Sequence, residues 1–253
     1  MDYDELLNLG TDLGRQFMGS GAEISRVEDS IRRLMQAYGV PDAQILAIPS
    51  FLIVCLTRPS GEPITRVCRI PAHGIDLDQL ELCNALCRRL CQQTPPLTEA
   101  RQLVADLNIS HPRYSGRAIL FGYFLVAAFF TPFFGGSLRD ALCGGLCGLS
   151  IGLATRFLER LTGSNPLFRN MFSAALSSIL AQLFVVLGVA HNADACTIGA
   201  LMLLVPGVAL TTAMREIVAG DIISSLVHMA ESLLTATAIA LGTGLALALG
   251  RLL

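Results

Sequence analysis

The chain has 253 residues, of which 53% are hydrophobic and 15% charged, and its formal net charge is −2. So large an apolar fraction is not typical of a soluble globular protein. The near-neutral charge, with no basic cluster interleaved with aromatic residues, gives no reason to expect nucleic-acid binding. Charged residues concentrate in the first part of the chain and apolar runs fill the rest. We therefore expect an α+β domain over residues 1–115 and a transmembrane domain over residues 116–253.

The first domain is expected to combine amphipathic helices with one β-hairpin. Apolar residues at helical spacing predict one helix before Ser20 and a second that ends at Gly39. Ser20 and Glu23 fit a capping box, which predicts Ser20 as the N-cap of the second helix. The remaining expected elements are a hairpin of residues 48–57 and 64–70, and helices over residues 76–93 and 97–107.

The second helix also has a charged face. Two interpretations stay open for it: a solvated face with ion pairs, or a surface that docks on the membrane domain. The residues concerned are Arg26, Glu28, Asp29, Arg32 and Arg33.

The eight cysteines predict neither a disulfide framework nor a metal site. Cys83, Cys87 and Cys91 recur every four residues, which places them on one helical face. A structural metal would need a fourth ligand at suitable spacing, and none is nearby. We interpret these residues as small apolar core residues and expect no metal and no cofactor.

Five membrane spans can be drawn in the second domain, so the expected fold is a mainly α-helical polytopic membrane protein. Their approximate bounds are 116–134, 138–156, 168–190, 197–214 and 222–249. If the N-terminal domain is cytoplasmic, the inner segments hold Arg117, Arg156, Arg160, Arg169 and Arg215, and the outer segments hold only Arg139 and Arg251. This distribution follows the positive-inside rule and predicts a cytoplasmic N-terminal domain. An odd number of spans would leave the C-terminus outside.

Two spans carry small or polar residues at helical spacing. Gly144, Gly148 and Gly152 form a doubled GxxxG pattern, which predicts close helix packing. The third span has Ser173, Ser177 and, deeper along it, Gln182. For these polar residues a structural role and a place along a substrate path remain equally open.

The fourth span is interrupted by Pro206-Gly207. Proline removes a backbone donor, so nearby carbonyl groups need other partners. The break is either a kink repaired by neighbouring helices or a broken helix that faces a substrate, as in many transporters. The downstream residues Thr211, Thr212, Arg215 and Asp221 favour the second interpretation, although the two charged ones also suit an interfacial turn.

The fifth span contains His228 and Glu231, three residues apart and therefore on one helix face. If the membrane begins near Ile222, Glu231 lies roughly 14 Å deep at ~1.5 Å per residue. An ionisable group at that depth marks a functional site by default. We interpret the two residues as proton-carrying groups, with a purely structural pair as the alternative.

Two stretches, GAEISRVEDSIRRLMQAYG and LLVPGVALTTAMREIVAGD, make the chain resemble the threonine/serine exporter (ThrE) family. The resemblance implies a proton-coupled secondary transporter of the inner membrane that exports threonine and serine or, in some members, succinate. Full-length members have about ten spans in two halves. The resemblance therefore implies the split form, in which a separate small membrane protein supplies the second half.

The leading prediction is thus an exporter subunit and not an enzyme. A membrane-embedded enzyme would use His228 and Glu231 as metal ligands or acid/base groups, but the sequence offers no convincing third ligand or nucleophile. A structural or regulatory subunit without its own substrate path is the other alternative, and homo-oligomers remain possible.

Overall fold

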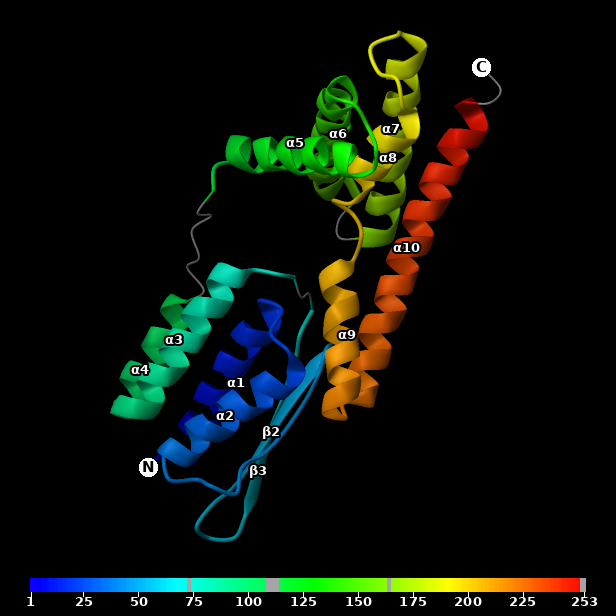
Figure 1. Cartoon of the computed structure of the whole chain (residues 1–253). Helices are drawn as coiled ribbons and strands as arrows, with labels where there is room; N and C mark the ends of the chain where they lie inside the picture. Colours follow the sequence, from blue (N-terminus) through cyan, green and yellow to red (C-terminus); the bar gives the residue numbers. More distant parts are fainter. Residues whose placement is uncertain (72–73, 108–113, 163–164, 251–253) are drawn as a thin grey trace. The chain divides into compact units, whose positions relative to one another are not determined.

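The computed structural model describes residues 1–71, 74–107, 114–162 and 165–250. It contains two compact units (Figure 1). The first joins Met1–His111 to Thr211–Met229, and the second joins Pro112–Leu210 to Ala230–Leu253. The first unit thus contains a late segment of the chain, Thr211–Met229, in addition to the N-terminal part.

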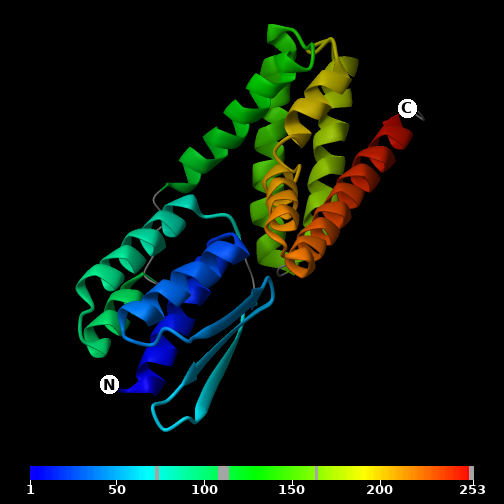
Figure 2. The same ribbon diagram turned by 60° about the horizontal axis from the view of Figure 1, so that its bottom comes forward.

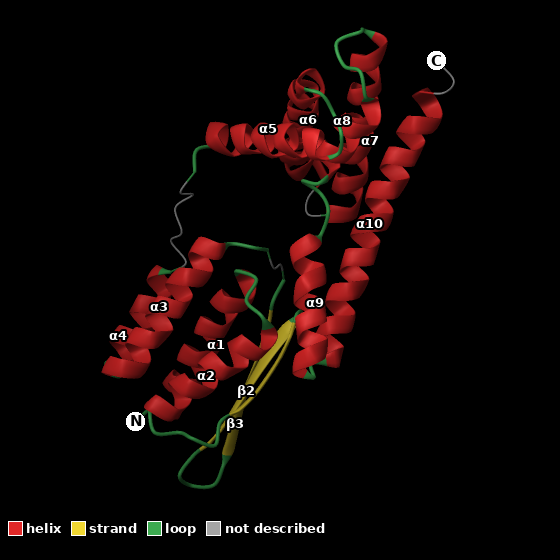
Figure 3. Ribbon diagram, in the orientation of Figure 1, coloured by secondary structure: helices red, strands yellow, loops and turns green. Residues whose placement is uncertain are grey.

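The N-terminal part of the first unit is a three-stranded antiparallel sheet with helices on one face (Figures 2 and 3). Its order along the chain is α1 (Tyr3–Gly19), α2 (Ile24–Ala37), β1 (Gln44–Ile48), β2 (Phe51–Thr57), β3 (Pro63–Arg69), α3 (Leu77–Gln93) and α4 (Leu97–Asp106). The expected hairpin corresponds to β2 and β3, paired from Phe51↔Arg69 to Thr57↔Pro63. Strand β1 was not predicted separately, because only the turn at Pro49-Ser50 divides its apolar residues from those of β2.

Alternation along β2 places its core side chains against α1. Leu52, Val54 and Leu56 are fully buried, as are Leu9 and Phe17 of α1. A strand with one buried face has this period of two, and an amphipathic helix supplies the matching apolar stripe. The result is a hydrophobic core shared by the sheet and the four helices.

The predicted capping box at Ser20 is wrong. Ser20 is the C-cap of α1, and its hydroxyl donates to the carbonyl oxygen of Phe17 at 2.8 Å. Gly21 has φ +83°, and the amide of Ala22 donates to the Phe17 carbonyl at 3.0 Å. This left-handed Schellman end stops α1, so α2 begins later, with Glu23 as an N-cap whose side chain makes no cap hydrogen bond.

Six further helices lie in the described residues from 114 onward. They are α5 (Gly116–Phe133), α6 (Leu138–Thr162), α7 (Pro166–Val186), α8 (Ala193–Leu201), α9 (Gly207–Ala219) and α10 (Ile222–Gly250). In the described part of the chain, α5, α6, α7 and α10 are each long and apolar enough to cross a membrane. Many large apolar side chains of these helices point outward, for example Phe129 and Phe133. A surface of this kind suits lipid and confirms a multi-pass membrane protein.

The fourth span, expected over residues 197–214 with an interruption at Pro206-Gly207, corresponds to two separate helices. Helix α8 has only 9 residues and ends at Leu201, and α9 has 13 residues and begins at Gly207. Residues 202–206 form turns and an extended link instead. Pro206 explains the break, because its ring disfavours a helical residue before it and suits the start of a new helix.

Three glycines of α6 allow α5 to approach closely. A Cβ atom at Gly144 would lie 2.0 Å from the Thr131 hydroxyl oxygen, and one at Gly148 would lie 2.5 Å from the Cβ of Ala127. At Gly152 the nearest atom of α5 would be 3.0 Å away. The backbones of α5 and α6 are therefore nearer to each other than any larger residue would permit.

Helices α7 and α10 make a second close contact. A Cβ at Gly242 would lie 2.1 Å from the carbonyl oxygen of Met171. Farther along, the Gln182 side-chain amide donates to the carbonyl oxygens of Ser178 and Ala246, each at 3.2 Å. Gln182 therefore links α7 to the last turns of α10.

Asp140 fastens the start of α6 to the link between α7 and α8. The carboxylate is 1% exposed and accepts hydrogen bonds from the backbone amides of His191 at 2.6 Å and Asn192 at 3.1 Å. It also accepts from the amide and hydroxyl of Ser137, at 2.8 and 2.7 Å. A buried carboxylate with four donors is well compensated for its desolvation.

We predict that Gly148→Ala destabilises the second unit by about 1–3 kcal/mol, because the added methyl group has no space against α5. Gly122→Ala on α5 is the matched control, since a Cβ there meets no atom within 4 Å. It should be neutral or stabilise by up to about 1 kcal/mol through helix propensity. Equilibrium unfolding in mixed detergent micelles measures both; equal effects would contradict the packing described here.

Asp140→Ala should cost about 2–4 kcal/mol, because it removes the acceptor of the His191 and Asn192 amides and of Ser137. Asp140→Asn keeps one acceptor oxygen and should cost less. Asp194, an exposed acid in the first turn of α8, provides the control variant Asp194→Asn. In thermal unfolding in detergent, Asp140→Ala should have the lowest melting temperature, Asp140→Asn a higher one and the control the highest. An Asp140→Ala variant as stable as the control would disprove this role.

Candidate functional site

The α9–α10 hairpin contains a buried carboxylate paired with a histidine. Glu216 of α9 is 2% exposed, and its Oε2 lies 2.8 Å from Nδ1 of His228 on α10. Its second oxygen, Oε1, is also buried and has no hydrogen-bond partner among the described residues. Both residues belong to the first compact unit.

This pair is suited to holding a proton. A buried carboxylate oxygen without a partner carries a desolvation cost, which a bound proton removes. The contact between Nδ1 of His228 and Oε2 of Glu216 needs one proton, which either the imidazole or the carboxyl group can supply.

Small residues keep the two helices of the hairpin close enough for this contact. The Ser225 hydroxyl donates to the carbonyl oxygen of Ala213 at 2.8 Å, and both residues are buried. At the turn, Gly220 has φ +93°, and the amide of Asp221 donates to the carbonyl of Glu216 at 2.9 Å. The predicted residue Asp221 therefore follows the glycine that ends α9, and its backbone closes the hairpin.

Two charged residues connect the hairpin to α2 within the same unit. The guanidinium of Arg215 forms an ion pair with the carboxylate of Glu23. Glu28 accepts a hydrogen bond from the amide of Ala47 at 2.8 Å. Burial raises the pKa of Glu28; the bond from Ala47 opposes this shift, and the negative charge of Asp221 adds to it. Part of the charged face of α2 therefore lies near the hairpin, whereas Asp29 and Arg33 pair with each other at the exposed surface.

The structure changes the expected surroundings of Glu231. Helix α10 has 29 residues and is about 43 Å long at ~1.5 Å per residue. A membrane core of about 30 Å needs only about 20 of them. The second unit contains the last part of α10, from Ala230 onward. If this part is the spanning segment, Glu231 lies at its first turn, not near its middle, and its side chain is exposed on this chain.

The other predicted residues lie along α9 and at its start. Pro206 and Gly207 form the boundary between the link and α9, where the amide of Leu210 donates to the Pro206 carbonyl at 3.1 Å. Thr211 is exposed, and Thr212 is half-buried. The structure therefore has a broken helix here and not a kink. The backbone of residues 202–206 lies between the end of α8 and the start of α9, outside any helix.

Buried hydroxyl groups line the second unit on three different helices. Ser173 of α7, Thr197 of α8 and Thr243 of α10 each have a buried side-chain oxygen without a hydrogen-bond partner among the described residues. Ser178 is different, because its hydroxyl donates to the Ala174 carbonyl within its own helix at 2.8 Å. Unpaired hydroxyls in an apolar bundle need water or a polar ligand.

The cysteines behave as core residues. Cys83 and Cys87 belong to the hydrophobic core of the N-terminal part, and burial raises their pKa values to about 11 and 12. Cys143, Cys147 and Cys196 belong to the core of the membrane helices. Within the described ranges, no group of three His, Cys, Asp or Glu residues is arranged to hold a metal ion.

Sequence reasoning did not identify Glu216 or Asp140. Glu216 stands beside Arg215 in a charged run, and only the hairpin turn at Gly220 brings it opposite His228. The sequence signal that could have identified Glu216 is its spacing from Ala213, because residues three positions apart share one face of a helix.

Comparison with known proteins identifies the family of the chain. The family model described as "Putative threonine/serine exporter" (ThrE) matches residues 8–250. No curated protein and no solved structure matches the chain. Because the match includes the N-terminal helices, the glycine-packed pair α5–α6 and the broken helix with its hairpin, the chain belongs to the threonine/serine exporter family.

Proposed function

We propose that this chain is the subunit of a proton-driven exporter of threonine and serine in the inner membrane, with its N-terminal module in the cytoplasm. The single observation that supports it most is the buried Glu216–His228 pair beside a broken membrane helix, in a chain of the exporter family. The family match favours threonine and serine over succinate and favours a transporter over an enzyme or a passive subunit.

The chain path gives this proposal a topology. The Arg215–Glu23 ion pair joins α9 to the start of α2 in the N-terminal module. Helices α5, α6 and α7 cross three times before α8 begins. The chain can return to the module only if α8 and α9 together complete a fourth crossing, and α10 is then the fifth. The arginine distribution is then the same as the one expected from the sequence, and it supports a cytoplasmic module.

In this topology the broken crossing is where substrate would pass. Short helices α8 and α9 end inside the membrane, and the link at residues 202–206 presents peptide groups to any neighbouring polar ligand. The unpaired hydroxyls of Ser173, Thr197 and Thr243 offer further hydrogen bonds in the same unit. Thr211, Thr212 and Arg215 continue along α9, where Arg215 can attract a carboxylate.

Proton coupling follows from alternate occupancy of the Glu216–His228 pair. Export of a zwitterion moves no net charge, so an inward proton can drive it in exchange. Protonation of the pair removes the desolvation cost of the unpaired Glu216 oxygen and favours one arrangement of the hairpin. Deprotonation restores this cost and disfavours the same arrangement. Glu231, one turn beyond His228, would pass the proton between the pair and the membrane-spanning part of α10.

The proposal also includes a partner. By its resemblance to the split form, a separate small membrane protein supplies the second half, which would start outside and form an inverted repeat with this chain. Helices that expose both apolar and small residues offer surfaces for it.

The proposal predicts export that depends on the proton gradient. Cells loaded with labelled threonine and serine should release them when this chain is expressed with a second-half protein, and an uncoupler should stop the release. Labelled succinate is the comparison substrate, and each half alone is the control. Failure to export threonine or serine in any combination would overturn the proposed function.

Glu216→Gln should lower uncoupler-sensitive export by about 5- to 150-fold, the range of a coupling free energy of ~1–3 kcal/mol. The amide keeps the shape of the carboxyl group, so insertion into the membrane should not change. His228→Asn should have an effect in the same range, and Glu231→Gln a smaller one. Export lost on Glu231→Gln but kept on Glu216→Gln would instead make Glu231 the proton-carrying residue.

A further inference from the structure

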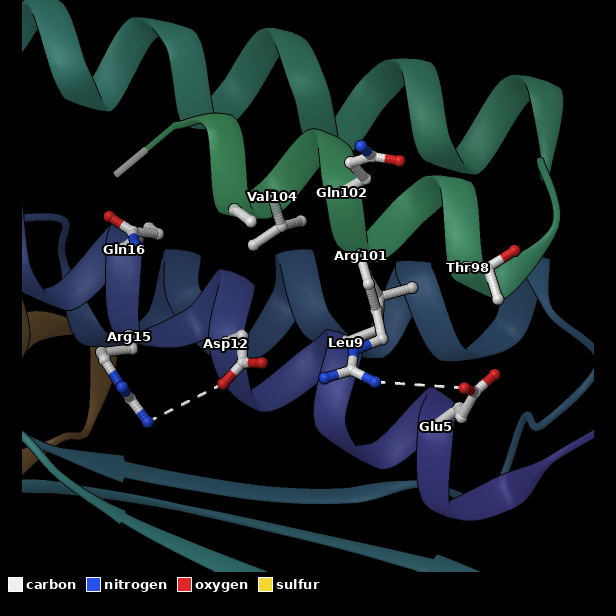
Figure 4. Close-up of a pocket in the computed structure, with 10 residues that line it drawn as sticks. Glu5, Leu9, Asp12, Arg15, Gln16, Thr98, Arg101, Gln102 and Val104 are labelled. Atoms are coloured by element: carbon white, nitrogen blue, oxygen red, sulfur yellow. Dashed lines mark ion pairs between the residues drawn. The ribbon is translucent and has the colours of Figure 1, made fainter. Parts of the chain in front are cut away.

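A cavity between α1 and α4 of the N-terminal module has charges of both signs along its walls (Figure 4). Its volume is about 510 Å³. Glu5, Asp12 and Arg15 enter it from α1, and Arg101 reaches across from α4 to lie between the two acids (Figure 4). None of these four residues belongs to the hairpin or the broken helix.

The charged groups of this cavity are only loosely paired with one another. The Arg101–Glu5 distance is 4.0 Å, and the Arg15–Asp12 distance is 3.7 Å. Both are longer than the 2.7–2.9 Å that is usual for a charge-assisted hydrogen bond, so neither pair uses its full donor and acceptor capacity. The four side chains are between one third and one half exposed, which lets a solute reach them.

The cavity is fixed in shape by what lies behind it. Leu9 and Val104 line it and are buried in the core, with 0% and 2% exposure. Arg15 is held by a hydrogen bond from its Nε to the Cys68 sulfur at 3.1 Å. The floor is therefore apolar, and at least one guanidinium stays in place without a ligand.

We propose that this cavity binds a free serine or threonine molecule from the cytoplasm and so serves as a regulatory site separate from the transport path. The two acids and two arginines that line the cavity sum to no net charge, which matches a zwitterion. Asp12 also lies 3.6 Å from Arg66 of β3, which is outside the lining. The guanidinium of Arg101 lies between the two acids (Figure 4), so it binds the α-carboxylate, and Glu5 beside it binds the α-ammonium group. The apolar floor at Leu9 accepts a short side chain.

This inference rests on the proposed export function for its choice of ligand. A dicarboxylate such as succinate would place a second negative charge against Glu5 or Asp12 and is excluded by like-charge repulsion. Because the charged groups are partly solvated, each contact contributes little, and a dissociation constant on the order of 1 mM is expected.

Thiol protection tests the site in the full-length protein, purified and placed in lipid nanodiscs. Gln102→Cys puts a reporter thiol on the exposed rim of the cavity, and Thr98→Cys provides a second reporter on the same helix. Wild-type protein gives the background labelling by a maleimide at neutral pH. This background is low for Cys83 and Cys87, because their raised pKa values of about 11 and 12 leave almost no thiolate.

L-threonine at about ten times its dissociation constant should slow labelling of either reporter roughly tenfold. Succinate lacks the ammonium group, and L-threoninamide lacks the carboxylate, so neither should protect. Arg101→Gln should remove the protection, whereas Arg69→Gln, an exposed arginine on β3 outside the cavity, should preserve it. Gln92→Cys on α3, outside this cavity, should be labelled at the same rate with and without threonine.

The proposal would be overturned if threonine did not slow the labelling of either reporter, or if succinate slowed it equally. The export assay separates this result from a failure of the proposed function. Intact threonine export without thiol protection would remove only the regulatory site. Protection that needs Arg101, in a protein that exports nothing, would support the binding site and remove the export function.

Discussion

The missing amide proton of Pro206 is the constraint on which the rest of the candidate site depends. A continuous helix over this region would carry Glu216 and Arg215 along an ordinary membrane span. The proline instead ends the helical run after Leu201 and starts a separate helix at Gly207. Because α9 is independent, it can pair with α10 in a hairpin that contacts α2. The polar backbone of the link remains between two short helices, where membrane transporters place their ligands.

Close packing is the second requirement, because a bundle in lipid gains little from hydrophobic association. Glycines and small residues perform this function at α5–α6 and α7–α10, and a hydroxyl–carbonyl contact performs it at α9–α10. Polar groups then fasten the ends: Asp140 binds the amides that precede α8, and Gln182 binds the last turns of α10. Among the described residues, the buried Glu216 oxygen and the hydroxyls of Ser173, Thr197 and Thr243 have no partner, in contrast to these satisfied contacts, and the proposed function assigns proton and substrate to them.

The N-terminal module and residues Thr211–Met229 of the α9–α10 hairpin form one compact unit, which gives the proposed regulatory ligand a physical route to the Glu216–His228 pair. The route consists of α1 and α2, the ion pair between Glu23 and Arg215, and the one-residue step along α9 to Glu216. A ligand between α1 and α4 would tighten the packing of α1 and thereby change the position of α2 relative to the hairpin. Coupling of this kind needs only a small free-energy difference between two arrangements of the hairpin.

The sequence by itself determined the membrane character, the α+β module, the hairpin of β2 and β3, the glycine pattern of α6 and the break near Pro206. These features depend on local periodicity, on composition and on the geometry of proline and glycine. Only the tertiary structure decided that the capping box is absent, that the break at Pro206 separates two helices and is not a kink in one, and that His228 faces Glu216, twelve positions earlier in the chain. Such contacts depend on where a turn reverses the chain and on which side chains then meet. Spacing within one helix favoured Glu231, because it shares a face with His228, whereas the turn at Gly220 brought a more deeply buried carboxylate opposite the same histidine.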